Sequence, residues 1–261
     1  MRRLPSSPCL SAMFVPIYDL DNPLRRVRFP FVNFAFISLN VAVFLMLQSG
    51  FFLPESVGHG LNVIFGVIPV EITTSQQVVP GVDLLPEPIT LVTYMFLHGG
   101  WLHLGGNMLF LWVFGDNVED AMGHGRYLLF VLLCGVAGAL VHVLVGPASG
   151  VPLVGASGAI AGVVAGYLVL HPRVKLWCLV AGRIPLRVDA RWALGAWVVM
   201  QFAFALLLAD EEVAWWAHVG GVLAGAALIV VLRRKDVALL DQDLPATPPP
   251  PPMPTLPARQ G

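Results

Sequence analysis

Six long apolar stretches restrict this chain to a membrane-embedded fold. Each is nearly free of charge, and most are about 18–20 residues long, enough at 1.5 Å per residue for a helix to cross a hydrocarbon core of about 30 Å. We therefore expect an all-α fold, a bundle of six transmembrane helices. The predicted spans are Phe31–Gln48, Trp101–Gly115, Tyr127–Val145, Val151–Leu170, Trp192–Ala209 and Val213–Leu232.

The composition agrees with this expectation. Hydrophobic residues make up 57% and charged residues 12% of the chain, against about 45–50% apolar and about 25% charged in soluble domains. The formal net charge of −1 argues against nucleic acid as a partner. Cys9, Cys134 and Cys178 match neither a disulfide framework nor a zinc site, so we expect no metal and no cofactor. Cys134 is expected to be a small apolar residue inside a span.

Basic residues predict the orientation, because Lys and Arg near spans stay in the cytosol. With six spans, three basic clusters fall on one side, and both termini lie in the cytosol. The turn that holds Asp210 to Glu212 is expected on the opposite side. The basic clusters are Arg25, Arg26 and Arg28; Arg173, Lys175, Arg183, Arg187 and Arg191; and Arg233, Arg234 and Lys235.

These features divide the chain into three parts. Residues 1–30 form a cytosolic N-terminal segment, residues 31–235 a six-span domain, and residues 236–261 a Pro-rich, disordered cytosolic tail. The long outside loop at residues 49–100 is interrupted by prolines and is expected to lie partly in the outer interface, with Phe51 and Phe52 as anchors. Loops of this length are often functional. We expect an integral multi-pass protein of a bacterial plasma membrane, in contact with the lipid bilayer.

Four polar residues inside the spans form a set. Such residues are costly in a membrane and are functional candidates by default. Counted from the predicted span starts at 1.5 Å per residue, Ser157 and Asn107 lie roughly 9 Å deep, His218 roughly 7.5 Å and His103 roughly 3 Å. His103 and Asn107 are four residues apart and share a helix face. All four are expected in one layer.

This set matches what acyl transfer requires. A serine hydroxyl becomes a nucleophile when a base removes its proton, and His218 is the base at the depth of Ser157. No carboxylate is expected at that depth, so the arrangement would be a Ser-His dyad. His103 and Asn107, with the backbone N–H of Ser157 near the positive end of its helix, could stabilise an oxyanion.

Stripes of small residues could bring the spans together. Small residues at four-residue spacing let transmembrane helices pack closely. One stripe is expected on the fourth span and one on the sixth, and packing alone would explain both equally well. The stripes are Gly158, Gly162 and Gly166, and Ala217, Gly221 and Gly225.

Three motifs resemble those of the rhomboid intramembrane serine proteases. They are His103-Leu104-Gly105-Gly106-Asn107, Gly155-Ala156-Ser157-Gly158, and Ala217-His218-Val219-Gly220-Gly221 with Gly225, and the similarity runs from about Thr90 to Leu232. The resemblance implies Ser157 as nucleophile, His218 as general base, and His103 with Asn107 on the oxyanion side. It also implies single-span membrane proteins as substrates, cut near their outer membrane boundary and entering laterally past the fifth span.

Two departures from the family pattern leave questions open. Many members carry a Trp-Arg pair in the first outside loop, which this chain lacks. Some have an aromatic residue that stacks on the catalytic histidine, where this chain has Ala161. The sequence therefore gives no partner for His218, and it gives no oligomeric state.

A non-enzymatic membrane protein is the rival hypothesis. In a transporter or a binding partner for other spans, His103, Asn107 and His218 would line a pore or a packing interface. A transporter would more often show an inverted repeat, and we find none in the sequence.

Overall fold

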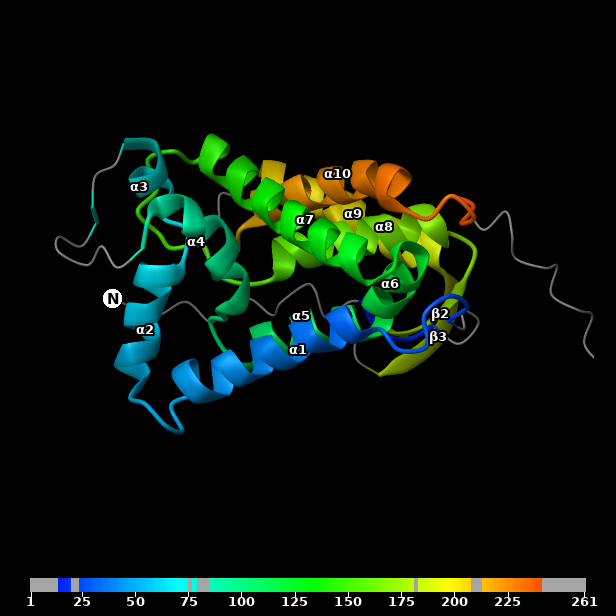
Figure 1. The fold of residues 1–261 in the computed structure, drawn as a ribbon, viewed down its shortest axis with the longest axis horizontal. Coiled ribbons are helices and arrows are strands. Elements are labelled where there is room, and N and C mark those ends of the chain that lie inside the picture. Colours follow the sequence, from blue (N-terminus) through cyan, green and yellow to red (C-terminus); the bar gives the residue numbers. More distant parts are fainter. Residues whose placement is uncertain are drawn as a thin grey trace, which may run out of the picture.

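The fold is a bundle of helices with one small sheet at its end (Figure 1). The computed structural model describes residues 14–19, 24–74, 77–78, 85–180, 183–207 and 213–240. Cys9, Asp210 to Glu212 and residues 241–261 of the predicted tail lie outside them. The mostly helical prediction is confirmed.

Four helices are long and apolar enough to cross a membrane, namely α1 (Phe31–Val43) with its π-helical continuation η2 (Phe44–Gln48), α7 (His124–Val145), α9 (Ala190–Leu207) and α10 (Trp215–Leu232). The second predicted span is a continuous helical run of α5 (Trp101–Phe110), η4 (Leu111–Gly115) and α6 (Asp116–Met122). The fourth is the shorter α8 (Ser157–Leu170). A count of six membrane spans stays a prediction.

The predicted start of the fourth span at Val151 is wrong. The helix begins at Ser157, and the preceding residues form an extended loop that makes an isolated antiparallel bridge between Leu153 and Val67. Pro152 lacks a backbone N–H, and Gly155 has a φ of +118°, so neither continues a helix. Counting 1.5 Å per residue from Val151 therefore does not give the depth of Ser157.

The long loop at residues 49–100 is largely helical. It contains α2 (Glu55–Phe65), α3 (Pro69–Thr74), α4 (Glu87–Thr93) and the 3₁₀ turn η3 (Tyr94–Phe96). Pro54 and Pro86 immediately precede α2 and α4, and Pro88 lies in the first turn of α4, where a fixed φ and a missing N–H suit a helix start. Figure 1 shows α2, α3 and α4 gathered at one end of the bundle.

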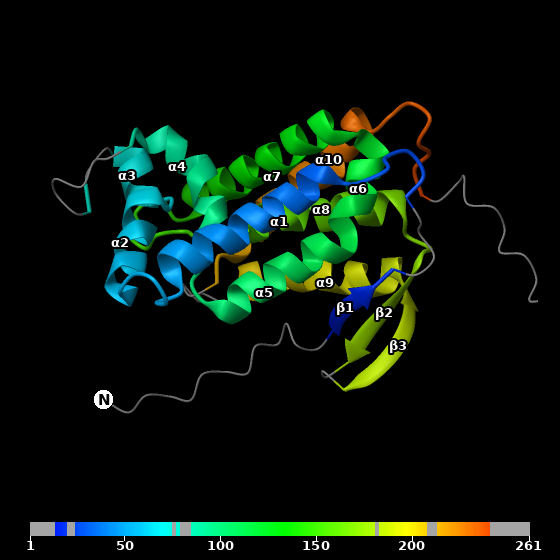
Figure 2. The ribbon, with the colours of Figure 1, turned by 60° about the horizontal axis from the view of Figure 1, so that its bottom comes forward.

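The opposite end carries a three-stranded antiparallel sheet that was not predicted. It consists of β1 (Phe14–Tyr18), β2 (Lys175–Val180) and β3 (Ile184–Asp189), in that order across the sheet. Leu176 and Cys178 alternate with more exposed neighbours and are buried. This period of two is typical of a half-buried strand, in a segment for which the sequence predicts only a basic connection between the fourth and fifth spans. Figure 2 shows the β2–β3 hairpin beside α9.

We call the end with the sheet the basic end, because the basic clusters meet there. Arg26, before α1, forms an ion pair of 2.9 Å with Asp236, after α10. Asp120 in α6 accepts hydrogen bonds from the backbone N–H groups of Arg26 and Val27, at 2.6 and 2.7 Å. Glu119 accepts two more from the first turn of α1, where N–H groups lack helical partners. That the basic end faces the cytosol stays a prediction.

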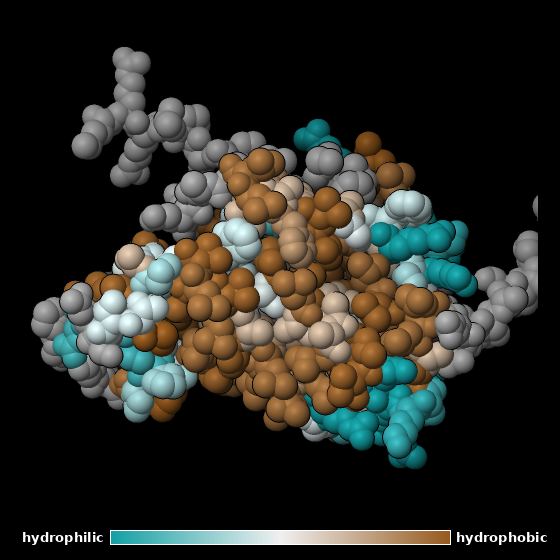
Figure 3. Space-filling model, turned by 90° about the horizontal axis from the view of Figure 1, so that it is seen from above, coloured by the Kyte–Doolittle hydropathy of each residue, from teal (hydrophilic) through white to brown (hydrophobic). Residues whose placement is uncertain are grey.

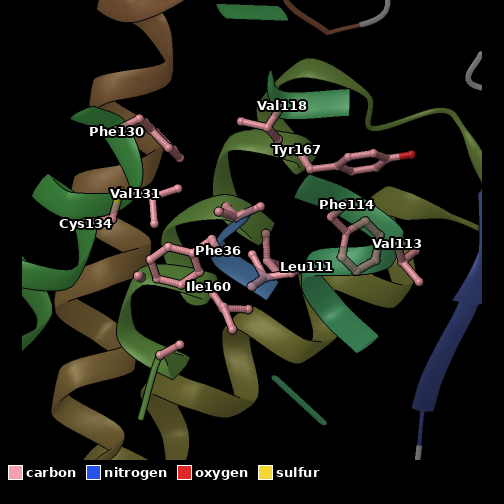
Figure 4. Close-up of a cluster of buried hydrophobic side chains, with 14 of the residues drawn as sticks. Phe36, Leu111, Val113, Phe114, Val118, Phe130, Val131, Cys134, Ile160 and Tyr167 are labelled. Atoms are coloured by element: carbon pink, nitrogen blue, oxygen red, sulfur yellow. The ribbon is translucent and has the colours of Figure 1, made fainter. Parts of the chain in front are cut away.

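The interior is filled by large apolar side chains from several helices. Phe36, Leu111, Phe114, Phe130 and Tyr167 meet around the middle of the bundle (Figure 4). Cys134 lies in this cluster as predicted and is fully buried. The outward faces are also apolar, and Figure 3 shows hydrophobic side chains covering the middle of one face, with hydrophilic groups towards its ends. Leu102 is 94% and Leu144 is 77% exposed, which fits a surface surrounded by lipid.

Candidate active site

Ser157 and His218 are in direct contact. Ser157 is the first residue of α8 and His218 lies in the first turn of α10. The Nε2 atom of His218 is 2.8 Å from the Oγ of Ser157, within the range that proton transfer requires. The predicted pair is therefore brought together from positions 61 residues apart.

Small residues permit this approach. A Cβ atom at Gly158 would lie 3.3 Å from the carbonyl oxygen of Ala217, the residue before His218. A Cβ atom at Gly221 would overlap the carbonyl oxygen of Gly158, and one at Gly225 would overlap the backbone of Gly162. The two small stripes thus face each other along α8 and α10, with Ser157 and His218 at the same end.

A residue on α9, Gln201, contacts the other nitrogen of His218. The Nδ1 of His218 is 2.8 Å from the Oε1 of Gln201, whose side chain is buried. Trp215 lies edge-on to the His218 ring, with centroids 5.8 Å apart. Gln201 was not among the predicted site residues, although it is the only polar amide in the span Trp192–Ala209. The cost of polar groups in membranes could have identified it.

His103 and Asn107 project from α5 to the loop that precedes Ser157. A Cβ atom at Gly155 would lie 2.6 Å from the Nε2 of His103 and 3.7 Å from the Nδ2 of Asn107. The Nδ1 of His103 accepts a hydrogen bond of 3.4 Å from the backbone N–H of Gly99. In a neutral ring the proton is then on Nε2, so His103 presents a donor towards Gly155.

A second histidine, His98, supports Asn107 and was also missed. Its Nε2 is 2.9 Å from the Nδ2 of Asn107, and its backbone N–H donates to Gln48, which in turn donates to Asn62. An amide nitrogen carries two hydrogens, so Asn107 keeps one donor besides the one directed at His98. Gln48 lies at the end of the first predicted span and Asn62 in α2, so the long loop takes part in holding the site.

The arrangement has the parts that acyl transfer needs. The Ser157 hydroxyl and the His218 imidazole are close enough for proton transfer. The first N–H groups of α8 have no acceptor within the helix and carry its positive end. His103 and Asn107 add side-chain donors beside Gly155, two residues before the serine. Within the described part of the chain, no group of three or more His, Cys, Asp or Glu side chains could hold a metal ion.

Comparison with known proteins identifies the family. The family model described as Rhomboid domain matches residues 86–235, which include all four predicted site residues and Gln201. The chain belongs to the rhomboid family. Rhomboid proteins are typically intramembrane serine proteases, which agrees with the contact between Ser157 and His218.

Curated rhomboid relatives come from different membranes. The chain is 34% identical over 166 residues to Rhomboid-like protein 11, chloroplastic, of Arabidopsis thaliana (61% of this chain, 58% of the relative). It is 31% identical over 137 residues to Rhomboid protease GluP of Bacillus subtilis (52% of this chain, 24% of the relative). It is 30% identical over 157 residues to Rhomboid protein 1, mitochondrial, of Saccharomyces cerevisiae (55% of this chain, 41% of the relative). Each match spans less than two thirds of the relative's own length.

These relatives do not agree on a single cellular compartment for the family. Two of their names refer to a chloroplast and a mitochondrion, and the third relative comes from a bacterium. The apolar helices and the rhomboid domain make this chain an integral membrane protein. The expected bacterial plasma membrane receives no support from the comparison.

Proposed function

We propose that this chain is an intramembrane serine endopeptidase that uses a Ser157–His218 dyad. The observation that carries the proposal is the 2.8 Å contact between Ser157 Oγ and His218 Nε2. A serine in a transmembrane helix commonly bonds to its own backbone, whereas here the Oγ of Ser157 lies within hydrogen-bond distance of a ring nitrogen of His218. The rhomboid domain over residues 86–235 supports the same function.

The reaction begins when the Nε2 of His218 takes the hydroxyl proton of Ser157. The Oγ attacks the peptide carbonyl, and the resulting oxyanion receives hydrogen bonds from His103, from the remaining N–H of Asn107 and from the backbone N–H of Ser157. His218 then protonates the leaving amine. Water attacks the acyl-enzyme with His218 again as base, which releases the second product and restores Ser157.

The substrates are proposed to be single-span membrane proteins, cut near the membrane boundary opposite the basic end. Ser157 lies at the first turn of α8, the end of that helix remote from the sheet. We place the basic end in the cytosol because Lys and Arg cluster there. Water reaches Ser157 from the other side, and no cofactor takes part.

Labelling with a fluorescent fluorophosphonate tests the activity without a known substrate. Purified wild-type protein in detergent should label, and Ser157→Ala and His218→Ala variants of matching thermal stability should not. Labelling of Ser157→Ala at the wild-type rate would place the reactive group elsewhere. Absence of labelling in a folded wild-type protein would favour the rival hypothesis, a rhomboid protein that binds other spans without cleaving them.

A further inference from the structure

We propose that Gln201 is the positioning residue that holds the His218 ring in the form able to accept the Ser157 proton. The inference rests on the proposed function and adds a third member to the dyad, supplied by α9. Aromatic stacking from α8 is not available for this purpose, because Ala161 occupies that position and is itself fully buried.

Hydrogen bonding fixes which way the Gln201 amide points. Its Nε2 donates to the carbonyl oxygen of Trp197, one turn earlier in α9, over 3.3 Å. A carbonyl oxygen accepts and never donates, so the reversed amide would set two acceptors against each other. Gln201 is only 2% exposed, and such an unsatisfied contact would be costly at a buried site. The Oε1 of Gln201 therefore faces His218.

The amide orientation then determines the histidine tautomer. The Oε1 of Gln201 is an acceptor only, so the Nδ1 of His218, 2.8 Å away, must carry a hydrogen. In the neutral ring this leaves Nε2 without a proton, and Nε2 is the atom that faces Ser157. The other tautomer would place an N–H against the Ser157 hydroxyl and could not act as a base.

The carbonyl group of an amide does this without adding charge. In serine proteases with a triad, a carboxylate orients the histidine and also stabilises the imidazolium that forms. Gln201 supplies the orientation alone, which suits a site where an unpaired buried carboxylate would be expensive. The contact joins α9 to α10. The His218 tautomer that can accept the Ser157 proton therefore depends on α9 remaining packed against α10 at Gln201.

Two substitutions separate orientation from packing. Gln201→Met keeps the length of the side chain but removes the acceptor. Gln201→Glu keeps an acceptor for Nδ1 and, when protonated, a donor for Trp197. We expect the fluorophosphonate labelling rate to fall at least about tenfold in Gln201→Met and to stay within about threefold of wild type in Gln201→Glu. Val199→Ala, at an exposed position of α9, is the control and should label like wild type.

A spectroscopic measurement tests the tautomer independently of activity. In ¹⁵N-histidine-labelled wild-type protein, the signals that vanish in His218→Ala should show a protonated Nδ1 and an unprotonated Nε2, and Gln201→Met should shift them. Wild-type signals with the proton on Nε2, or equal labelling rates for Gln201→Met and wild type, would overturn the role of Gln201. A wild-type protein that fails to label but shows the expected tautomer would instead count against the proposed protease activity.

Discussion

Gly155 donates its backbone N–H to the carbonyl oxygen of Tyr94 over 2.9 Å. Val67 and Leu153 form two more hydrogen bonds, at 2.8 and 3.1 Å. These three hydrogen bonds hold the loop before Ser157 against the segment before α5. The long loop, whose role the sequence left open, therefore acts as a support for the serine. Loops that lack such a support are more mobile, whereas catalysis requires a fixed nucleophile.

Replacing Gly155 should abolish labelling of Ser157. The φ of +118° is strained for any side chain, and a Cβ atom would lie 2.6 Å from His103. We expect Gly155→Ala to reduce the fluorophosphonate labelling rate by at least about 100-fold, because a displaced loop moves both the nucleophile and the donors. The matched control is Gly105→Ala in α5, where nothing lies within 4 Å of an added Cβ. Equal labelling in both variants would show that the loop tolerates displacement.

Gly225 should be essential for stability. An added Cβ would overlap the backbone of Gly162, which cannot move as a flexible side chain could. We expect Gly225→Ala to lower the free energy of unfolding by about 1–3 kcal/mol or more, measured by thermal unfolding in detergent. Gly195→Ala, in α9 with nothing within 4 Å of the added Cβ, should unfold at or slightly above the wild-type temperature. Matching midpoints for the two variants would contradict the close contact of α8 and α10.

The proposed stabilisation of the oxyanion by His103 and Asn107 can be tested by substituting each residue. Removing one oxyanion donor in serine proteases costs about 10²–10³ in rate, so we expect losses of this order in the labelling of His103→Ala and Asn107→Ala. His59→Ala, at an exposed position of α2, serves as control. Unchanged labelling in either variant, with normal thermal stability, would exclude that residue from the oxyanion site.

Stability should fall as the pH rises from about 4 to 7. At the basic end, burial raises the pKa of the Asp19 carboxyl to about 7, with a further contribution from nearby Asp116, whose own pKa burial raises to about 6. The folded state holds these protons above the pH at which the unfolded chain releases them. The stabilisation is therefore complete near pH 4 and lost as the pH passes 6 and 7.

The measurement is the unfolding temperature in detergent at several pH values. Asp19 accepts hydrogen bonds from Asn117 and Tyr167, at 2.9 and 3.0 Å, and an asparagine at this position can accept both. We expect Asp19→Asn to weaken the pH dependence and to raise the unfolding temperature at pH 8 relative to wild type. A wild-type curve that is flat or rises between pH 4 and 7 would contradict the raised pKa values of Asp19 and Asp116.

The four predicted site residues were accessible from the sequence, because polar groups inside apolar spans are rare and their spacing is local. The helix over Phe31–Gln48 and the start of the second helical run at Trp101 were also predicted as found, since apolar length and glycine breaks are local signals. The predicted end of that run at Gly115 was wrong, because the helix continues through α6 to Met122. The catalytic roles of Ser157, His218, His103 and Asn107 stay predictions until the variants are measured.

Three features depended on contacts between distant segments. Gln201 is one polar residue in an apolar span, and only the packing of α9 against α10 directs it at His218. The sheet needs β1 and β2, which lie about 160 residues apart in the chain. The late start of α8 follows from hydrogen bonds that Gly155 and Leu153 make with residues of the long loop. Local sequence thus determined which segments are apolar and which polar side chains are candidates for the site. Tertiary packing decided the partner of His218 and the support of Ser157, because those interactions exist only once the helices are assembled.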